Sequence, residues 1–144
     1  NKVIKSILNK ESKLKLNKVE TFKKFFGKIN DLKLNLRNFL KSELNKNKVI
    51  HCYGASTKGN VLLQYFKINN KKVKFVAERN HNTYGLVTPG TKIKIISEKL
   101  SRALRPDYYL VLPWHFKKEI LTREKVTIDN GTKFIFPLPK LEII

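Results

Sequence analysis

The segment with the clearest potential for chemistry covers residues 49–60 and reads VIHCYGASTKGN. An apolar run ends at a glycine, and a short polar loop then leads into an amphipathic stretch. A strand, a tight loop and a helix N-terminus in this order leave backbone N–H groups unpaired at the positive end of the helix dipole. Side-chain hydroxyls and an ammonium group would add donors there. The sequence therefore predicts a phosphate-binding loop formed by Gly54, Ser56, Thr57, Lys58 and Asn60.

This loop differs from the two best-known phosphate loops. Gly54 and Gly59 have the separation of a Walker A motif, but Asn60 stands where that motif needs its lysine. In the dinucleotide-binding fingerprint, a second glycine would stand at Ser56. Glu78 follows the next apolar run, where the dinucleotide fold often holds a ribose, or where it could simply pair with a neighbouring arginine. ATP hydrolysis is not expected, and dinucleotide binding is disfavoured.

The hydroxyls of the loop have a second interpretation. Ser56 and Thr57 stand just before a helical stretch, where such residues commonly cap the helix through its unpaired N–H groups. Capping and phosphate binding can coexist at one helix end, so both remain open.

Another candidate is the apolar run 108–112 with the residues that follow it. Trp114 could stack on a base or a sugar, and His115 could bind phosphate or move a proton. The alternative is a packed tryptophan beside a histidine that caps the next helix. No metal site is expected, since the three histidines lack ligand spacing and Cys52 is the single cysteine.

Two patterns place these residues on structural elements. Residues 18–45 repeat apolar side chains every three or four positions, which predicts a long amphipathic helix after a shorter one at 2–8. Its phenylalanine stripe is interpreted as core packing, or as packing on a neighbour outside the chain. After residue 47, strands are expected at 49–53, 73–77, 93–96, 108–112 and 133–136, and helices at 58–66, 98–104 and 116–129.

Alternating strands and helices predict an α/β fold. We expect a Rossmann-like, mainly parallel sheet with helices on both faces over residues 48–144, preceded by an N-terminal helical segment at 1–47. Ligands of such sheets bind at the carboxyl ends of the strands. Three loops meet this description, at 54–60, 77–91 and 113–116.

The net charge of +20 on 144 residues raises the possibility of a nucleic-acid partner. The excess is spread along the chain, with 14 Lys and Arg against 4 Asp and Glu in residues 1–48. The many lysines and asparagines equally suit an A+T-rich genome. No apolar run is long enough to cross a membrane, and a cytoplasmic location is expected. The absence of methionine suggests a piece of a longer protein.

Several consecutive motifs resemble one family. The motifs are YGASTKGNVLLQYF (53–66), AERN (77–80), YGLVTPGTKI (84–93), RPDYYLVLPWHFKKEI (105–120) and KFIFPLP (133–139). In this order and spacing they resemble the C-terminal domain of the S-adenosylmethionine (SAM)-dependent C-methyltransferases that act on nucleotide-linked keto-deoxysugars. The resemblance is strong over residues 49–140. Two departures concern turns: His81 replaces a common proline, and Thr132 replaces a glycine.

The resemblance implies a division of labour within a larger enzyme. In the family, a zinc-binding region and a SAM-binding domain precede this domain, and the motifs of both are absent from the chain. The chain would therefore not bind SAM or be catalytically competent alone. It would bind a nucleoside diphosphate sugar, with the diphosphate at the loop of Ser56 and Lys58 and with Arg79 and His115 nearby. A nucleic-acid-binding module and a nicotinamide-type Rossmann oxidoreductase are the alternatives.

Overall fold

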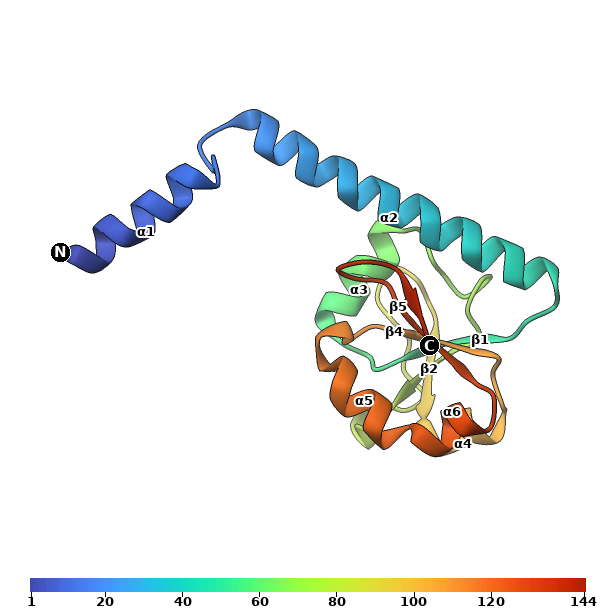
Figure 1. Ribbon diagram of the computed structural model, residues 1–144. Coiled ribbons are helices and arrows are strands. Elements are labelled where there is room, and N and C mark those ends of the chain that lie inside the picture. Colours follow the sequence, from blue (N-terminus) through green and yellow to red (C-terminus); the bar gives the residue numbers. More distant parts are fainter. The chain divides into compact units, whose positions relative to one another are not determined.

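The computed structural model describes residues 1–144, apart from the side chain of residue 45. The chain divides into two compact units, Asn1–Leu34 and Asn35–Ile144. One long helix, α2 (Val19–Asn45), contributes residues to both (Figure 1). The functional domain boundary expected after residue 47 stays a prediction.

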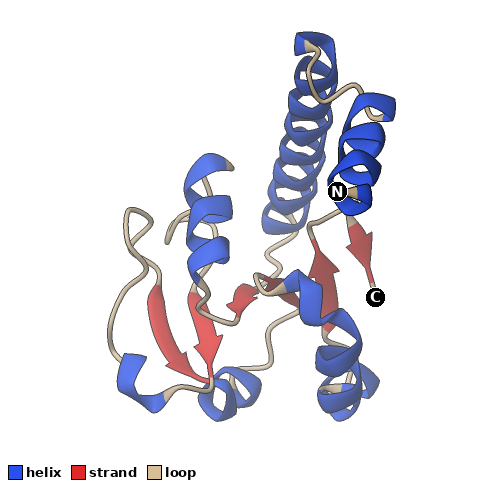
Figure 2. Cartoon of the chain, turned by 90° about the vertical axis from the view of Figure 1, so that its left-hand side faces the viewer, coloured by secondary structure: helices blue, strands red, loops and turns tan.

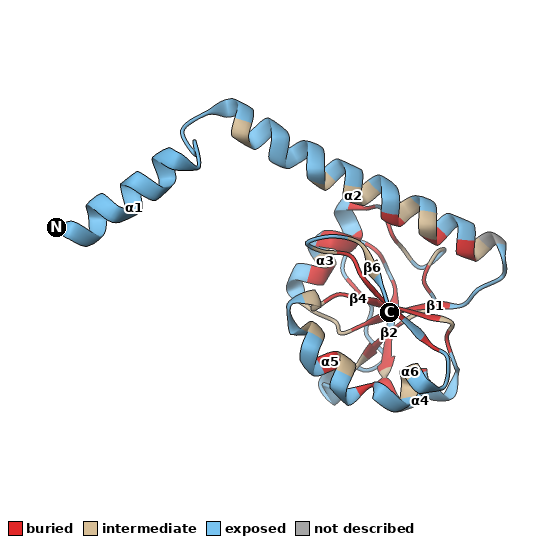
Figure 3. Cartoon of the chain, viewed as in Figure 1, coloured by how far each residue is buried: buried red, intermediate tan, exposed pale blue. Residues whose placement is uncertain are grey.

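The first unit holds α1 (Lys2–Lys13) and the beginning of α2. The side chain of Asn1 caps α1 by accepting a hydrogen bond from the Val3 N–H, and the helix extends beyond the expected 2–8. No residue of α1 is buried (Figure 3). The expected core packing of the phenylalanine stripe is wrong in this unit, because no element of residues 1–34 covers it. Its members are 50–58% exposed: Phe22, Phe25 and Phe26.

The second unit is built on one six-stranded sheet. Its strands lie in the order β3-β2-β1-β4-β5-β6, and all neighbours pair in parallel except β5 and β6. The strands are β1 (Ile50–Tyr53), β2 (Phe75–Glu78), β3 (Lys94–Ser97), β4 (Tyr108–Val111), β5 (Lys133–Phe136) and β6 (Glu142–Ile143). The helical elements are α3 (Thr57–Tyr65), η1 (His81–Thr83), α4 (Glu98–Ala103), η2 (Trp114–Phe116), α5 (Lys117–Arg123) and α6 (Lys125–Asp129).

The central strands explain why the sheet forms. Every residue of β1 and β4 is buried, as expected for parallel strands covered on both faces. Neighbouring tyrosines of β4 serve the two faces, because successive side chains point to opposite sides. The Tyr108 hydroxyl donates to Glu43 of α2 at 2.8 Å, whereas the Tyr109 hydroxyl is bonded to Ser101 of α4 at 2.8 Å. Figure 2 shows helices on both sides of the strands, and the predicted α/β fold is confirmed.

Several details differ from the prediction, among them two in the C-terminal part of the chain. The single helix expected over 116–129 is instead η2, α5 and α6, because the chain leaves helical geometry at Glu124, whose side chain is drawn into a buried polar network. The short strand β6 was not expected. It has only two residues and follows a proline-containing segment, which leaves no alternation to detect.

Candidate functional site

The candidate site lies where the strand order reverses, between β1 and β4. Open α/β sheets bind ligands in the crevice outside the carboxyl ends of the strands at such a point. A pocket of about 330 Å³ opens at this edge. It is lined by residues from the end of β1 and its loop, the end of β2, the loop after β4, η2, the start of α4 and α5.

The β1 loop and the β4 loop touch at a glycine. Gly54 has a φ of +80°, and a Cβ atom placed on it would lie 2.8 Å from two ring carbons of Pro113. Both the positive φ and the close approach require glycine. Gly59 is similarly confined, because a Cβ there would lie 2.5 Å from the Cβ of Leu112.

We therefore expect Gly54→Ala to lower the free energy of unfolding by about 2 kcal/mol, through backbone strain and overlap with Pro113. Urea unfolding followed by the fluorescence of Trp114, the single tryptophan, measures the change. Gly27→Ala is the matched control. Gly27 lies inside a helix with nothing within 4 Å of a new Cβ, so this change should stabilise the chain slightly. Equal effects of the two substitutions would contradict the prediction.

Ser56 caps α3, as one interpretation of the sequence expected. Its Oγ accepts a hydrogen bond from the Gly59 N–H at 3.0 Å, and its residue also lines the pocket. Thr57 and Lys58 follow in the first turn with exposed side chains that have no partner among the described residues. A lysine is unfavourable at the positive end of a helix dipole unless an anion is present. The Thr57 hydroxyl and the Lys58 ammonium group are thus available to donate hydrogen bonds to an anion at this helix end.

Asn60 lies one turn into α3. Its Oδ1 is buried without a hydrogen-bond partner among the described residues. It does not line the pocket. Its place in a ligand site stays a prediction.

Glu78 joins the two strand ends instead of pointing a free carboxylate into the pocket. One oxygen accepts from the Ala55 N–H of the β1 loop. The other accepts from the backbone N–H groups of Arg79 and Asn80, at 2.8 and 3.0 Å. The expected pairing with the Arg79 side chain is replaced by this contact with its backbone. These three hydrogen bonds occupy most of the lone pairs of the Glu78 carboxylate. Few are left to accept hydrogen bonds from the hydroxyl groups of a ribose.

The other candidates from the sequence are separated by the structure. Arg79 is exposed and lines the pocket together with Gly54 and Ser56. Trp114 does not line the pocket but packs against the core cluster that includes Tyr109 and Phe134, as the alternative interpretation expected; the other half of that interpretation is wrong, because no side chain among the described residues caps α5. His115 is exposed, and its ring lies 4.3 Å from that of Phe116.

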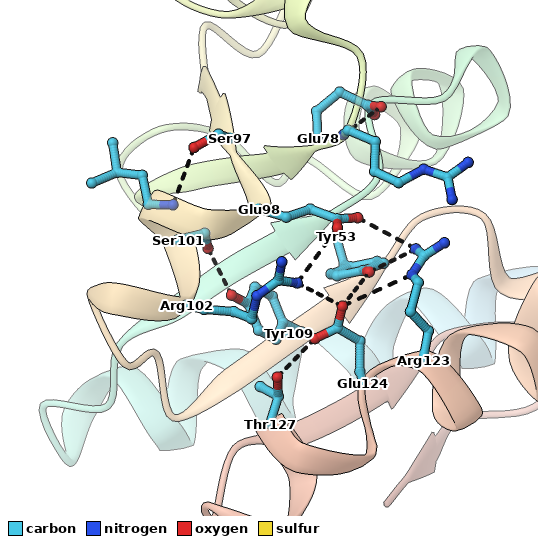
Figure 4. A network of polar contacts seen from close by, with 12 residues as sticks. Tyr53, Glu78, Ser97, Glu98, Ser101, Arg102, Tyr109, Arg123, Glu124 and Thr127 are labelled. Atoms are coloured by element: carbon cyan, nitrogen blue, oxygen red, sulfur yellow. Dashed lines mark hydrogen bonds and ion pairs between the residues drawn. The ribbon is translucent and has the colours of Figure 1, made fainter.

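Sequence reasoning missed a polar network that includes several pocket-lining residues (Figure 4). The Tyr53 hydroxyl donates to Glu124 at 2.7 Å and accepts from Arg123 at 2.7 Å. Arg123 also contacts Glu98 at 3.3 Å and Glu119 at 3.5 Å. Burial raises the pKa of the Tyr53 hydroxyl, so it remains protonated and able to donate. The one available signal was the four-residue spacing of Glu119 and Arg123 on a helix that follows a strand end.

A second set of buried polar contacts involves His51. His51 of β1 is 1% exposed, and its Nδ1 is 2.8 Å from the hydroxyl of Ser101, which is bonded in turn to Tyr109. Burial lowers the pKa of His51 to about 4. On the same strand, burial raises the pKa of the Cys52 thiol, which agrees with the interpretation of this cysteine as a small buried hydrophobic residue.

The comparison with known families identifies this architecture. A family described as "C-methyltransferase C-terminal domain" matches residues 1–139. The chain belongs to this C-methyltransferase family. The expectation drawn from the motifs is thereby confirmed, and the match extends over the N-terminal helices that resemble the family less clearly.

A curated relative of this C-methyltransferase domain is the C-methyltransferase NovU of Streptomyces niveus. It is 29% identical over 123 residues, which cover 85% of the present chain and 29% of NovU. The chain thus spans less than a third of the length of this relative. Within the described residues, no helix is long and apolar enough to cross a membrane, and no three His, Cys, Asp or Glu side chains cluster as metal ligands.

Proposed function

We propose that this C-methyltransferase domain binds the nucleoside diphosphate sugar on which a larger SAM-dependent enzyme acts. The observation that carries the proposal is the joining of two features at one sheet edge. The exposed donors of the α3 N-terminus lie directly beside a pocket formed where the strand order reverses, and Ser56 belongs to both. The diphosphate would bind at Thr57 and Lys58, where the helix dipole favours anions.

The methyl donor would bind in a part of the enzyme outside this chain. Dinucleotide-binding α/β folds hold a ribose on an acid that follows the second strand, and Glu78 has this position. Its oxygens already accept three backbone N–H groups, so the residues present do not fit that role. The proposed partners are thus the zinc-binding and SAM-binding domains of the same enzyme, and the chain alone would orient the substrate without transferring a methyl group.

The double variant Thr57→Val, Lys58→Ala tests the diphosphate site. We expect it to bind a nucleoside diphosphate sugar at least tenfold more weakly, because it removes a hydroxyl donor and a charge-assisted contact. Isothermal titration with UDP-glucose and dTDP-glucose measures the affinity. The fold should survive, since neither side chain has a partner among the described residues.

Two controls make the result specific. Lys125→Ala removes the same charge from an exposed position on α6 and should leave the affinity unchanged. Titrations with duplex DNA and with NADH test the nucleic-acid and oxidoreductase alternatives. Binding of either one, without binding of a nucleotide sugar, would sink the proposed function.

A further inference from the structure

The pocket beside α3 has a charge balance that does not suit a diphosphate. Two arginines, Arg79 and Arg123, and three glutamates, Glu78, Glu98 and Glu119, line it. Arg123 is already held by the Tyr53 hydroxyl and by two of these glutamates. A multiply charged phosphate group entering here would meet carboxylates that repel it.

One carboxylate in the pocket is available to a ligand. The side chain of Glu119 is 62% exposed, and only its Oε1 contacts Arg123, at 3.5 Å. Its Oε2 has no partner among the described residues. Glu98 is different, because its side chain is 11% exposed and both of its oxygens contact arginines. Glu119 can therefore accept an N–H or O–H from a ligand while Arg123 keeps its place.

The pocket also has an apolar side. Phe116 is 53% exposed although it belongs to the lining, which also includes Pro113 and the buried Ile120. A large exposed aromatic side chain in a pocket is suited to stacking on a flat ring. The pocket thus combines a hydrogen-bond acceptor, Glu119, with an aromatic side chain three residues before it in the chain, and this pair can recognise an uncharged ring bearing hydrogen-bond donors.

We propose that this pocket binds an uncharged, donor-bearing ring of the ligand through Glu119 and Phe116, while the diphosphate stays at the α3 N-terminus. The proposal rests on the proposed function, because it divides one nucleotide-sugar ligand between two neighbouring subsites. A pyrimidine base and a hexose both present such a ring. A pocket of about 330 Å³ has room for one of them.

The test compares Glu119→Gln with Asp129→Asn, which changes the net charge equally at an exposed position on α6 with no partner among the described residues. Each variant is titrated with inorganic pyrophosphate and with dTDP-glucose. We expect Glu119→Gln to weaken dTDP-glucose binding about tenfold, because an amide accepts hydrogen bonds less strongly than a carboxylate. Its affinity for pyrophosphate should stay equal to that of Asp129→Asn or rise.

Two smaller ligands tell the ring sources apart. A loss of affinity for thymidine monophosphate alone assigns the pocket to the base, and a loss for glucose 1-phosphate alone assigns it to the sugar. Phe116→Ala, a substitution of an exposed side chain, should weaken the binding of the same small ligand that Glu119→Gln affects.

The opposite result is equally clear. If Glu119→Gln raises the affinity for dTDP-glucose as much as it raises the affinity for pyrophosphate, the carboxylate only repels the phosphate groups. The inference is then overturned. If the unaltered chain binds dTDP-glucose and Glu119→Gln binds it as tightly as Asp129→Asn does, this inference alone is overturned. Failure of the unaltered chain to bind dTDP-glucose overturns the proposed function with it.

Discussion

Replacing Glu124 with alanine should lower the free energy of unfolding by about 3–5 kcal/mol. Glu124 is 2% exposed and accepts from the Tyr53 hydroxyl, from Arg102 and from Thr127, each at 2.7 Å. Alanine would leave a buried hydroxyl and a partly buried guanidinium without their acceptor. Urea unfolding followed by Trp114 fluorescence measures the loss.

Glu119→Ala is the matched comparison, because Glu119 and Glu124 both contact Arg123. The side chain of Glu119 is 62% exposed, whereas that of Glu124 is 2% exposed. The exposed pair should contribute no more than about 0.5 kcal/mol. If the two substitutions cost the same, the buried network does not hold the junction between α5 and α6 as described.

Acid should begin to destabilise the domain as the pH falls below 6.5, because of His51. His51 has a folded-state pKa of about 4, below the ordinary value of 6.5, because burial penalises the imidazolium. Between about pH 4 and pH 6.5, His51 is therefore protonated in the unfolded chain and neutral in the folded chain. The stabilisation is complete above pH 6.5 and is lost progressively as the pH falls to about 4, by about 3 kcal/mol in total.

Urea unfolding at several pH values tests this window. His51→Phe should flatten the pH dependence between 4 and 6.5, whatever it costs in absolute stability, whereas His81→Gln in the exposed loop should not. Hydrogen bonds from lysine side chains lower the pKa values of three carboxylates, those of Glu43, Asp107 and Glu142. These groups therefore affect the stability at lower pH. An unchanged slope in His51→Phe would show that another group causes the acid sensitivity.

The elements that form the site were predictable because buried parallel strands are short apolar runs. β1, β4 and β5 lie within a residue of their expected ranges. The position of the β1 loop at a strand's carboxyl end followed from that alternation. The order of strands in the sheet did not, because it depends on pairing between distant segments. That order places Gly54 against Pro113.

Side-chain environments were less accessible to sequence reasoning. Trp114 and Phe116 lie two positions apart, and nothing in their types indicates that the tryptophan packs inside while the phenylalanine lines the pocket. Glu119 and Arg123 resemble an ordinary solvated helix pair. Their importance comes from Tyr53, which is 70 residues away in the chain and meets Arg123 only in the folded sheet.

The contact between Glu78 and the Ala55 N–H has a consequence for the kinetics of recognition. It fixes the β1 loop with bonds internal to the protein, so this loop is already in its final shape when a ligand arrives. A ligand would then lose little affinity to the entropy of ordering the loop, and association should not wait for a conformational change. Glu78→Gln should slow association more than it speeds dissociation, a pattern that stopped-flow measurements can distinguish from the loss of a direct ligand contact.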